Sequence, residues 1–418
     1  MRWVIFLIAL EACLAQQALG PELTLITQVK LKVADNLNSL PNYTCQQTIE
    51  RSRRVMPARR FEMLDTVRLE VALVEHRELY GWPGANRIAE SELSNLVGGT
   101  IGNGDFGLLA RSIFLSDGSF FTRAGDEVID GRKAIRYDYL VPLLSSGYHL
   151  KVPPHTALVA YHGSFWVESS SLDLLKLDLT ADEIPLILGL RSSTKTLHYH
   201  RSPIGASTFL LPSSAELLMV DLNGTEHRNR TLFHGCRQYA GESVLSFGEP
   251  PPDAPAAAAP ELTRIELPDE FTADIALTGP IDSSTSAVGD PVEATLARNL
   301  KYQGKLIAPK GAVIKGRLTR LQRETNLYSF AMVLYSMEFP GSHADLSGRE
   351  NQLSIQSPVR SPCMASGYSS CLPMQSPHGQ LQVSGTHLKL WRGFQIQLRS
   401  LAKTSVPNDG VLLKSEKQ

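Results

Sequence analysis

The stretch ALVAYHGSFWVESSSLDLLKLDL, residues 157 to 179, decides the fold class of this 418-residue chain. Its first half, residues 157–168, predicts two strands around Gly163, and the alternating apolar side chains of residues 172–179 predict another strand. Similar strand patterns occur at residues 67–73, 135–141, 194–200, 215–222 and 242–247. So many strands with short connections predict one large antiparallel sheet.

Helices are predicted around these strands. Apolar residues recur at spacings of three and four, which is typical of one helix face, at Ile26, Val29, Val33, Leu37 and Leu40. Pro41 ends this helix. Residues 88–97 and 106–115 predict two short helices, and Asp130-Gly131 predicts a hairpin turn. We therefore expect a mainly β fold with an α+β N-terminal domain, in which the helices gather on one face of the sheet.

A Pro/Ala-rich segment, GEPPPDAPAAAAPE at residues 248–261, divides the chain. Its prolines give a stiff, extended spacer without a core. We expect a domain at residues 21–247, a second at residues 262–405 and a tail at residues 406–418. Because the spacer offers no apolar surface, we also expect the two domains to move independently.

The second domain contains GKLIAPKGAVIKGRL, residues 304–318. A phosphate loop needs Lys and a hydroxyl residue at the start of a helix, but here Gly311 is followed by Ala312, Val313 and a strand pattern. Pro309-Lys310-Gly311 is therefore predicted to be a turn between strands. We expect a small β-barrel, interrupted by a polar Ser/Gly/Pro loop at residues 341–380.

The N-terminus, MRWVIFLIALEACLAQQALG at residues 1–20, has the pattern of a secretory signal peptide. We expect either a mature N-terminus between Gln16 and Pro21 or a lipid anchor on Cys13, because Leu10-Glu11-Ala12-Cys13 resembles a lipobox with an atypical Glu. A buried strand or a retained membrane anchor is the remaining alternative. No later apolar run approaches the roughly 20 residues that span a bilayer. These features predict a periplasmic or extracellular protein.

Four cysteines remain when Cys13 is set aside. An even number in an exported chain predicts disulfides, with three pairings open. We expect the pairs Cys45–Cys236 and Cys363–Cys371, since each pair then lies within one expected domain. No C-x-x-C pair occurs, so the sequence gives little support for thiol redox catalysis or structural zinc.

The order of the leading helix, LPNYTCQQTIERSRR and YHGSFWVESSSLDLLKLDL resembles the LolA/LppX-type half-barrel of bacterial envelope lipoprotein carriers. It is also similar to exported proteins of Acidobacteria. The resemblance implies an antiparallel half-barrel sheet whose concave face binds acyl chains, but it assigns that role to no single residue. Cys45 and Cys236 are not part of the carrier pattern.

The second domain resembles the C-terminal β-barrel of TrbI-like channel subunits of type IV secretion systems. The matching pieces are GDPVEATL, GKLIAPKGAVIKGRL and LKLWRGFQIQL, at residues 289–296, 304–318 and 388–398. Those subunits insert an apolar helical pair where this chain has the polar residues 341–380. The resemblance therefore implies a barrel module without a pore.

Two further patterns have the residue types of small-ligand sites. Gly102, Gly104 and Gly107 have the spacing of a dinucleotide loop, with acids at Asp126 and Glu127, but no strand precedes them and the surroundings are antiparallel. A plain flexible loop is the favoured interpretation. His198 and His200 share one strand face as a metal pair would, but no third ligand stands out. We expect no metal site and no cofactor.

An arginine cluster, ERSRRVMPARRF at residues 50–61, predicts a hairpin tip. One interpretation is a solvated turn, and the other is a contact with anionic headgroups or polymers, which guanidinium groups bind through paired hydrogen bonds. The candidate residues are Arg51, Arg53, Arg54, Arg59 and Arg60.

The expected function is a non-enzymatic envelope protein that binds an apolar ligand such as a lipid, a lipoprotein or another envelope protein. A component of a secretion or surface machine is the first alternative, and a secreted hydrolase is the second. No catalytic constellation can be picked out. The formal charge of −1 gives no global basic field for nucleic acid.

Overall fold

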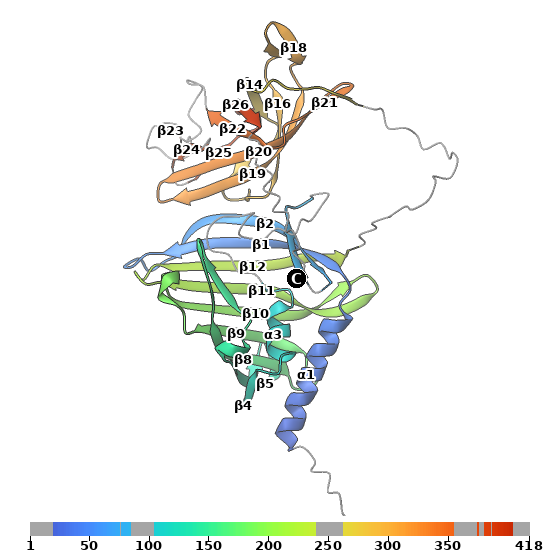
Figure 1. Ribbon diagram of the computed structural model, residues 1–418, viewed down its shortest axis with the longest axis vertical. Coiled ribbons are helices and arrows are strands. Elements are labelled where there is room, and N and C mark those ends of the chain that lie inside the picture. The colour runs from blue at the N-terminus through green and yellow to red at the C-terminus, as the bar shows by residue number, and fades with distance from the viewer. Residues whose placement is uncertain are drawn as a thin grey trace, which may run out of the picture.

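The computed structural model describes residues 20–75, 77–84, 104–239, 262–354, 374–375, 380–385 and 387–403. Within them it contains two curled sheets that are antiparallel apart from one short pair, and the mainly β fold class is confirmed (Figure 1). Several predicted features lie outside the described residues: the signal segment, the helix at 88–97, the strand at 242–247, the spacer at 248–261 and the pair Cys363–Cys371.

The N-terminal sheet has the strand order β3-β2-β1-β12-β11-β10-β9-β8-β5-β4. Its first and last strands along the chain, β1 and β12, stand third and fourth in this order and pair antiparallel. The strands are β1 (Tyr43–Arg54), β2 (Glu62–Val74), β3 (Arg77–Gly81), β4 (Phe120–Ile129), β5 (Arg132–Val141), β8 (Ala160–Glu168), β9 (Leu174–Asp182), β10 (Leu190–Ile204), β11 (Ser207–Asp221) and β12 (Glu226–Gln238). A small hairpin, β6 (His149–Val152) and β7 (His155–Leu158), and two short 3-10 turns, Leu143–Ser145 and Leu186–Leu188, connect them.

The prediction that residues 157–168 form two strands around Gly163 is partly wrong. The break falls at Val159, between β7 and β8, and Gly163 lies inside β8 opposite Tyr139. A Cβ on Gly163 would lie 1.9 Å from the carbonyl oxygen of Asp178 and 2.9 Å from the Tyr139 hydroxyl, which donates a 2.8 Å hydrogen bond to that carbonyl. Glycine therefore makes room for a tyrosine from the next strand and does not interrupt the strand.

Two described helices cover the concave face of this sheet (Figure 1). Helix α1 (Pro21–Ser39) begins with proline at its first position and buries Val29, Val33 and Leu37, as the apolar spacing predicts. Helix α3 (Leu108–Phe114) confirms the short helix predicted at 106–115. Neither helix is long and apolar enough to cross a membrane.

The C-terminal sheet has the order β13-β21-β20-β19-β16-β14-β26-β22, with β24 also paired to β20. The predicted turn at Pro309-Lys310-Gly311 is confirmed: it joins β18 to β19, and Gly311 has φ of 88°. The strands are β13 (Thr263–Arg264), β14 (Phe271–Leu277), β15 (Ile281–Asp282), β16 (Pro291–Leu296), β17 (Leu300–Tyr302), β18 (Lys305–Ala308), β19 (Val313–Glu324), β20 (Leu327–Phe339), β21 (Ser342–Asp345), β22 (Arg349–Ser354), β23 (Met374–Gln375), β24 (Leu381–Ser384), β25 (Lys389–Leu390) and β26 (Gln395–Lys403).

Part of the polar loop predicted at 341–380 is strand. Residues 342–354 contain β21 and β22, and this segment buries only a few apolar side chains: Ala344 in β21, Leu353 in β22 and Leu346 between them. Glycines with positive φ, Gly341 and Gly348, make the turns that precede each strand. The surrounding serines and acids gave this segment a loop-like composition.

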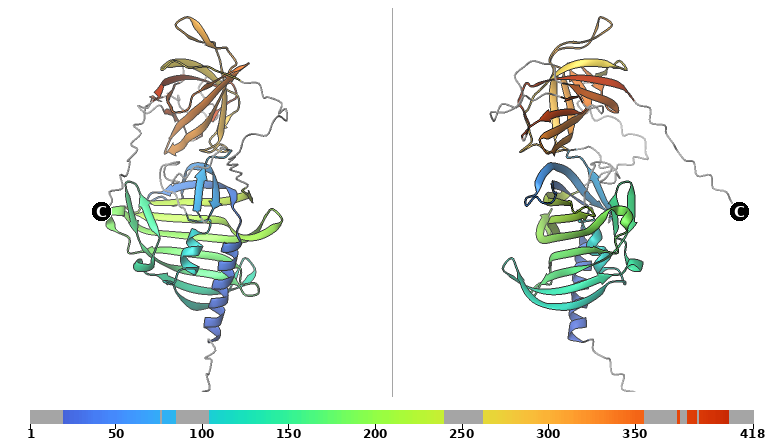
Figure 2. Two further views of the ribbon diagram at one scale, coloured as in Figure 1. Left: turned by 45° about the vertical axis from the view of Figure 1, so that its right-hand side comes forward. Right: turned by 90° about the vertical axis from the view of Figure 1, so that its left-hand side faces the viewer.

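The two sheets are docked against each other along β2 (Figure 2). The backbone of β2 donates from Arg68 N to Val288 O at 2.8 Å and accepts from Val288 N at Thr66 O at 2.9 Å. From β19 of the C-terminal sheet, Arg317 donates to Pro83 O at 3.2 Å, and its guanidinium lies 5.8 Å from the Trp82 ring centroid. These contacts contradict the expectation of independent movement, because spacer composition carries no information about surfaces elsewhere in the two units.

Candidate ligand pocket beneath the first helix

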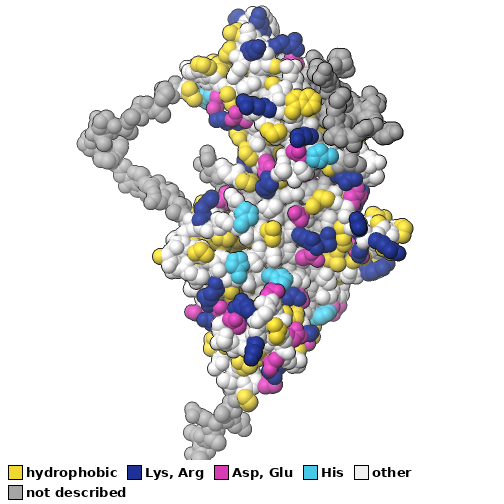
Figure 3. All heavy atoms as spheres, turned by 180° about the vertical axis from the view of Figure 1, so that it is seen from behind, with side chains coloured by type: hydrophobic (Ala, Val, Ile, Leu, Met, Phe, Trp, Pro, Cys, Tyr) yellow, Lys and Arg dark blue, Asp and Glu magenta, His cyan; other side chains and the backbone are white. Residues whose placement is uncertain are grey.

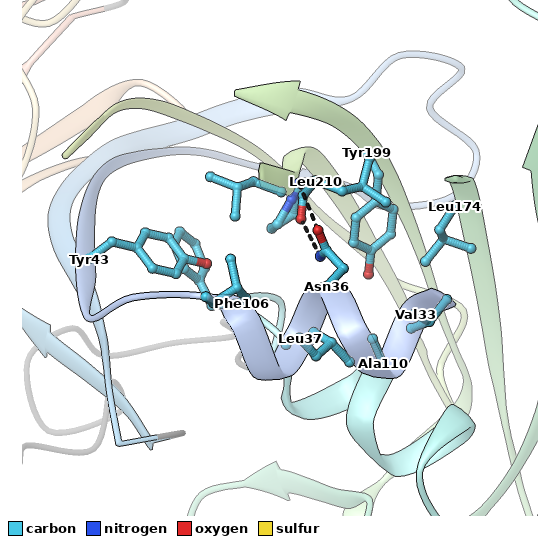
Figure 4. Close-up of a pocket in the computed structure, with 13 residues that line it drawn as sticks. Val33, Asn36, Leu37, Tyr43, Phe106, Ala110, Leu174, Tyr199 and Leu210 are labelled. Carbon is cyan, nitrogen blue, oxygen red and sulfur yellow. Dashed lines mark hydrogen bonds between the residues drawn. The ribbon is translucent and has the colours of Figure 1, made fainter. Parts of the chain in front are cut away.

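Helix α1 is seated on the concave face by one apolar stripe and one polar clamp. Val33 and Leu37 point into the sheet, and Asn36 lies between them on the same face. The Asn36 side chain donates from Nδ2 to Leu210 O and accepts from Leu210 N, both at 3.0 Å (Figure 4). This double hydrogen bond joins the helix to β11 as a strand neighbour would.

A pocket lies between α1, α3 and the sheet (Figure 4). Its wall is apolar except for Asn36 and two tyrosines. The lining residues are Val33, Asn36, Leu37, Leu40, Tyr43, Phe106, Gly107, Ala110, Leu174, Tyr199, Leu210, Leu211 and Pro212. The space open to the centre of a water-sized sphere is about 20 Å³, which is room for roughly one water molecule. The pocket is therefore closed around its own side chains.

Two buried tyrosine hydroxyls belong to this pocket. Within the described part of the chain, the hydroxyls of Tyr43 and Tyr199 have no hydrogen-bond partner. Burial raises the pKa of both phenols well above the usual value, and nearby Glu78 adds to the rise, so both stay neutral donors. Buried polar groups are normally paired, and an unpaired one costs roughly 1–3 kcal/mol. These hydroxyls are suited to a polar group of a ligand.

A second hollow adjoins the pocket at the C-terminal end of α1. It shares Leu37, Leu40 and Gly107 with the first and adds the polar residues Asn42 and Arg111. Arg111, on α3, donates to Asn38 Oδ1 of α1 at 3.4 Å. The apolar pocket thus has a polar mouth with one cationic group.

The glycine-rich turn next to the pocket is tightly held rather than a plain flexible loop. Glu78 of β3 accepts hydrogen bonds from Gly104 N at 2.9 Å, Phe106 N at 2.8 Å and the Tyr80 hydroxyl at 2.6 Å. Burial raises the pKa of Glu78, and these hydrogen bonds oppose the rise. Gly102 lies outside the described residues, and Asp126 and Glu127 lie on β4, where they pair with Arg123 and Arg136.

Asp105 and Lys195 form a buried ion pair beneath this turn. Lys195 Nζ lies 2.6 Å from Asp105 Oδ1, and the two side chains are 2% and 5% exposed. Burial lowers the pKa of Lys195, but Asp105 and the other neighbouring acidic groups raise it more, so the ammonium stays charged. The pair fixes the start of α3 to β10 and thereby positions one wall of the pocket.

An aromatic floor continues from the pocket beneath the N-terminal half of α1. Phe165 is central: its ring centroid lies 4.8 Å from that of Phe114 and 5.3 Å from that of Tyr137. Phe121 lies 5.9 Å away, and Lys30 of α1 lies over its ring at 5.6 Å. The concave face is therefore apolar along α1 and not only at the pocket.

The predicted disulfide Cys45–Cys236 is present, with a Cα–Cα distance of 4.1 Å. It joins β1 to β12, which come first and last along the chain among the strands of the N-terminal sheet. Cys45 is buried and Cys236 is partly buried against the same core, so the bond lies at the edge of the core. Its pairing follows from the strand order.

The histidine pair does not form a metal site in the residues described. His198 and His200 lie on β10, and His200 Nε2 lies 2.8 Å from the Ser202 hydroxyl. Within the described ranges, no group of three His, Cys, Asp or Glu side chains could hold a metal ion.

The sequence pattern identified Val33, Leu37 and Leu40 of the pocket wall, but not the polar residues of the pocket and its surroundings. Asn36 sits on the apolar stripe of α1 and could have been noticed as a polar residue between Val33 and Leu37. Tyr43, Tyr199, Asp105 and Lys195 meet only through the strand order and gave no local signal.

No family model matches the chain, and no curated protein matches it. Similarities to solved structures cover about half of it. They include a domain assigned to outer membrane lipoprotein sorting from Vibrio parahaemolyticus (12% identity, TM-score 0.29, 52% of this chain and 93% of that one). A DUF1329 family protein from Desulfovibrio piger (11%, 0.28, 53% and 94%) and a LolA superfamily protein from Nitrosomonas europaea (14%, 0.26, 51% and 93%) are also similar.

Proposed function

We propose that this chain is an exported, non-enzymatic protein of the cell envelope that binds an apolar ligand with a small polar head between α1, α3 and the concave sheet. The observation that carries the proposal is the apolar pocket under α1, whose polar groups are Asn36 and two tyrosine hydroxyls. Ligand sites are typically apolar hollows with a few placed polar groups. The signal-like residues 1–20 support export.

Binding requires α1 to move. The pocket has room for roughly one water molecule, so an acyl chain fits only when the helix lifts from the sheet. The Asn36–Leu210 clamp opposes that movement with two hydrogen bonds, each contributing about 1 kcal/mol net. An acyl chain would replace the contacts that Val33 and Leu37 make with the sheet, and so shift the population toward the open form.

The polar groups give the ligand an orientation. Arg111 and Asn42 at the mouth, together with the tyrosine hydroxyls of the adjoining pocket, would hold a polar or anionic head at this end of α1. The aromatic floor extends away under α1 and offers apolar surface for the tail. A fatty acid or the acyl part of a lipid or lipoprotein has this combination of an apolar body and a small head.

The alternatives fit this geometry less well. An assembly component would present a flat, polar sheet face, whereas the concave face is apolar and covered by helices. A hydrolase needs a nucleophile, a base and an acid together in a cleft. The polar side chains of the pocket are one amide and two phenols, which favours binding over catalysis.

Titration with a dansyl-labelled fatty acid tests this proposal. We expect saturable binding with enhanced fluorescence, and faster uptake by the Asn36→Ala variant, by up to about 30-fold if both clamp bonds break during opening. Gln28→Ala is the matched control, because Gln28 is an exposed amide residue on the same helix and lines neither the pocket nor its mouth. Absence of saturable binding, or equal uptake rates in Asn36→Ala and the wild type, would contradict the proposal.

A further inference from the structure

The hairpin tip between β1 and β2 exposes apolar and cationic side chains together. Val55, Met56 and Met63 are 51%, 66% and 44% exposed, and Arg59 and Arg60 are exposed beside them. Figure 3 shows cationic and hydrophobic side chains gathered at the edge of the molecule where β1 and β2 turn. Single exposed apolar residues are ordinary, but a cluster bordered by arginines indicates a contact surface.

Neighbouring strands hold two more guanidinium groups in place. Arg54 and Arg228 both lie against the ring of Phe61, at 4.6 Å and 3.9 Å from its centroid. Burial lowers the pKa of Arg228, and the adjacent Arg230 and Arg54 lower it further. An anion bound here would offset the repulsion between these guanidinium groups. It would not need to order Arg54 or Arg228, because both already lie against Phe61.

The tip has an excess of positive charge. Arg54 pairs with Glu226 and Arg230 with Glu216, whereas Arg59, Arg60 and Arg228 have no carboxylate partner among the described residues. Because the whole chain carries a formal charge of −1, this excess is local.

Two of the five candidate arginines do not belong to this surface. Arg51 is buried and pairs with Asp65, donating from Nε to Oδ1 at 2.6 Å. Arg53 precedes Arg54 on the strand, and adjacent strand residues point to opposite faces. The cations of this surface are therefore Arg59, Arg60 and Arg228, with Arg54 beside them in its pair with Glu226.

We propose that the β1–β2 tip docks on the anionic headgroups of a membrane surface. The guanidinium groups would bind lipid phosphates through paired hydrogen bonds, and Val55 and Met56 would enter the interface between headgroups and acyl chains. The apolar tip favours lipid over nucleic acid or a soluble polyanion, because neither has an apolar interior into which Val55 and Met56 could insert. The tip lies twelve residues along β1 from Tyr43, roughly 35–40 Å from the pocket by strand rise.

Vesicle co-sedimentation tests the docking. The purified protein is mixed with vesicles of phosphatidylcholine alone or with phosphatidylglycerol, at low and at high salt. Three double variants are compared: Arg59→Gln with Arg60→Gln, Val55→Ser with Met56→Ser, and Lys301→Gln with Lys305→Gln. The lysine pair is the matched control, because it flanks another exposed hairpin, β17–β18, with Tyr302 and Leu306 exposed beside it.

We expect binding only to the anionic vesicles, weakened by salt. Loss of the two arginines should lower the affinity about 30-fold, and loss of the two apolar residues by at least about 10-fold. The lysine control should bind as the wild type does. Fatty-acid titration of the same variants should be unchanged, which separates this proposal from the pocket.

Three results would overturn the docking: no binding to anionic vesicles, equal loss in the lysine control, or arginine variants that bind as the wild type does. Salt-sensitive binding to single-stranded DNA without binding to vesicles would also overturn it, and would assign the tip to a soluble polyanion. Circular dichroism of each variant shows whether the fold is retained, and the exposed position of all six substituted residues makes loss of folding an unexpected result.

Discussion

Arg68 on β2 and Asp290 are 222 residues apart in the chain, yet Arg68 Nη1 lies 2.7 Å and 2.6 Å from the two carboxylate oxygens of Asp290. Gly289, next to Asp290, makes this approach sterically feasible. A Cβ there would lie 2.2 Å from Arg68 O and 3.0 Å from the Trp82 ring. The N-terminal and C-terminal sheets therefore meet backbone to backbone.

The Gly289→Ala variant should separate the two sheets. The added methyl group clashes with β2, and the positive φ of 101° adds strain. We expect one unfolding transition in the wild type and two in the variant, with faster proteolysis in the proposed spacer at 248–261. Gly311→Ala is the control, because Gly311 also has positive φ but open space around it. Two transitions already present in the wild type would count against a joined unit.

The Tyr199→Phe variant should bind ligand less tightly without loss of stability. Its hydroxyl has no partner in the described structure, so its removal costs no internal hydrogen bond. The Tyr139→Phe variant removes the bond to Asp178 O and should lower the free energy of unfolding by about 1 kcal/mol. Urea titration and fatty-acid affinity are measured for both variants. A clear loss of stability in Tyr199→Phe would contradict this, because it would show that the hydroxyl already makes a stabilising hydrogen bond within the protein.

Loss of the Cys45–Cys236 bond should destabilise the N-terminal sheet. The bond closes a sequence separation of 191 residues. Loop entropy for that length gives an upper figure of about 5 kcal/mol. The Cys45→Ser variant should therefore melt well below the wild type. Non-reducing peptide mapping checks the pairing and also tests the predicted Cys363–Cys371 bond. A bond that joins a cysteine of one pair to a cysteine of the other would refute both pairings.

The buried pair Arg51–Asp65 should matter for stability and not for membrane docking. The Asp65 side chain is 1% exposed, so Asp65→Asn removes the carboxylate charge opposite a buried guanidinium and should cost about 3 kcal/mol. Glu216→Gln, which breaks the exposed pair with Arg230, should cost less than about 1 kcal/mol. Thermal unfolding measures both. Equal costs would mean that Arg51 is more accessible than its burial indicates.

Local patterns predicted the elements that depend on local chemistry. The apolar spacing of Val29, Val33 and Leu37 predicted α1, and Asp130-Gly131 predicted the β4–β5 turn, where both residues have positive φ. Gly163 was misread because its role depends on Tyr139 in a neighbouring strand. That information exists only after the strands have paired.

The candidate site was less predictable than the fold. Asp105 and Lys195 are 90 residues apart and pair only because the strand order brings β10 beneath the glycine turn. Arg51 looked like its neighbours in sequence, but alternation along β1 buries it against Asp65. The contact of Gly289 with β2 could not be read from the spacer, since the two surfaces meet at residues far from it.

Native mass spectrometry of the protein purified from its own cells tests the proposed ligand binding most directly. The account predicts a non-covalent adduct with the mass of an acyl-chain lipid or fatty acid, lost on solvent extraction and displaced by the dansyl-labelled fatty acid. A protein that carries no adduct and retains no added fatty acid would contradict the claim that the hollow beneath α1 is a ligand site.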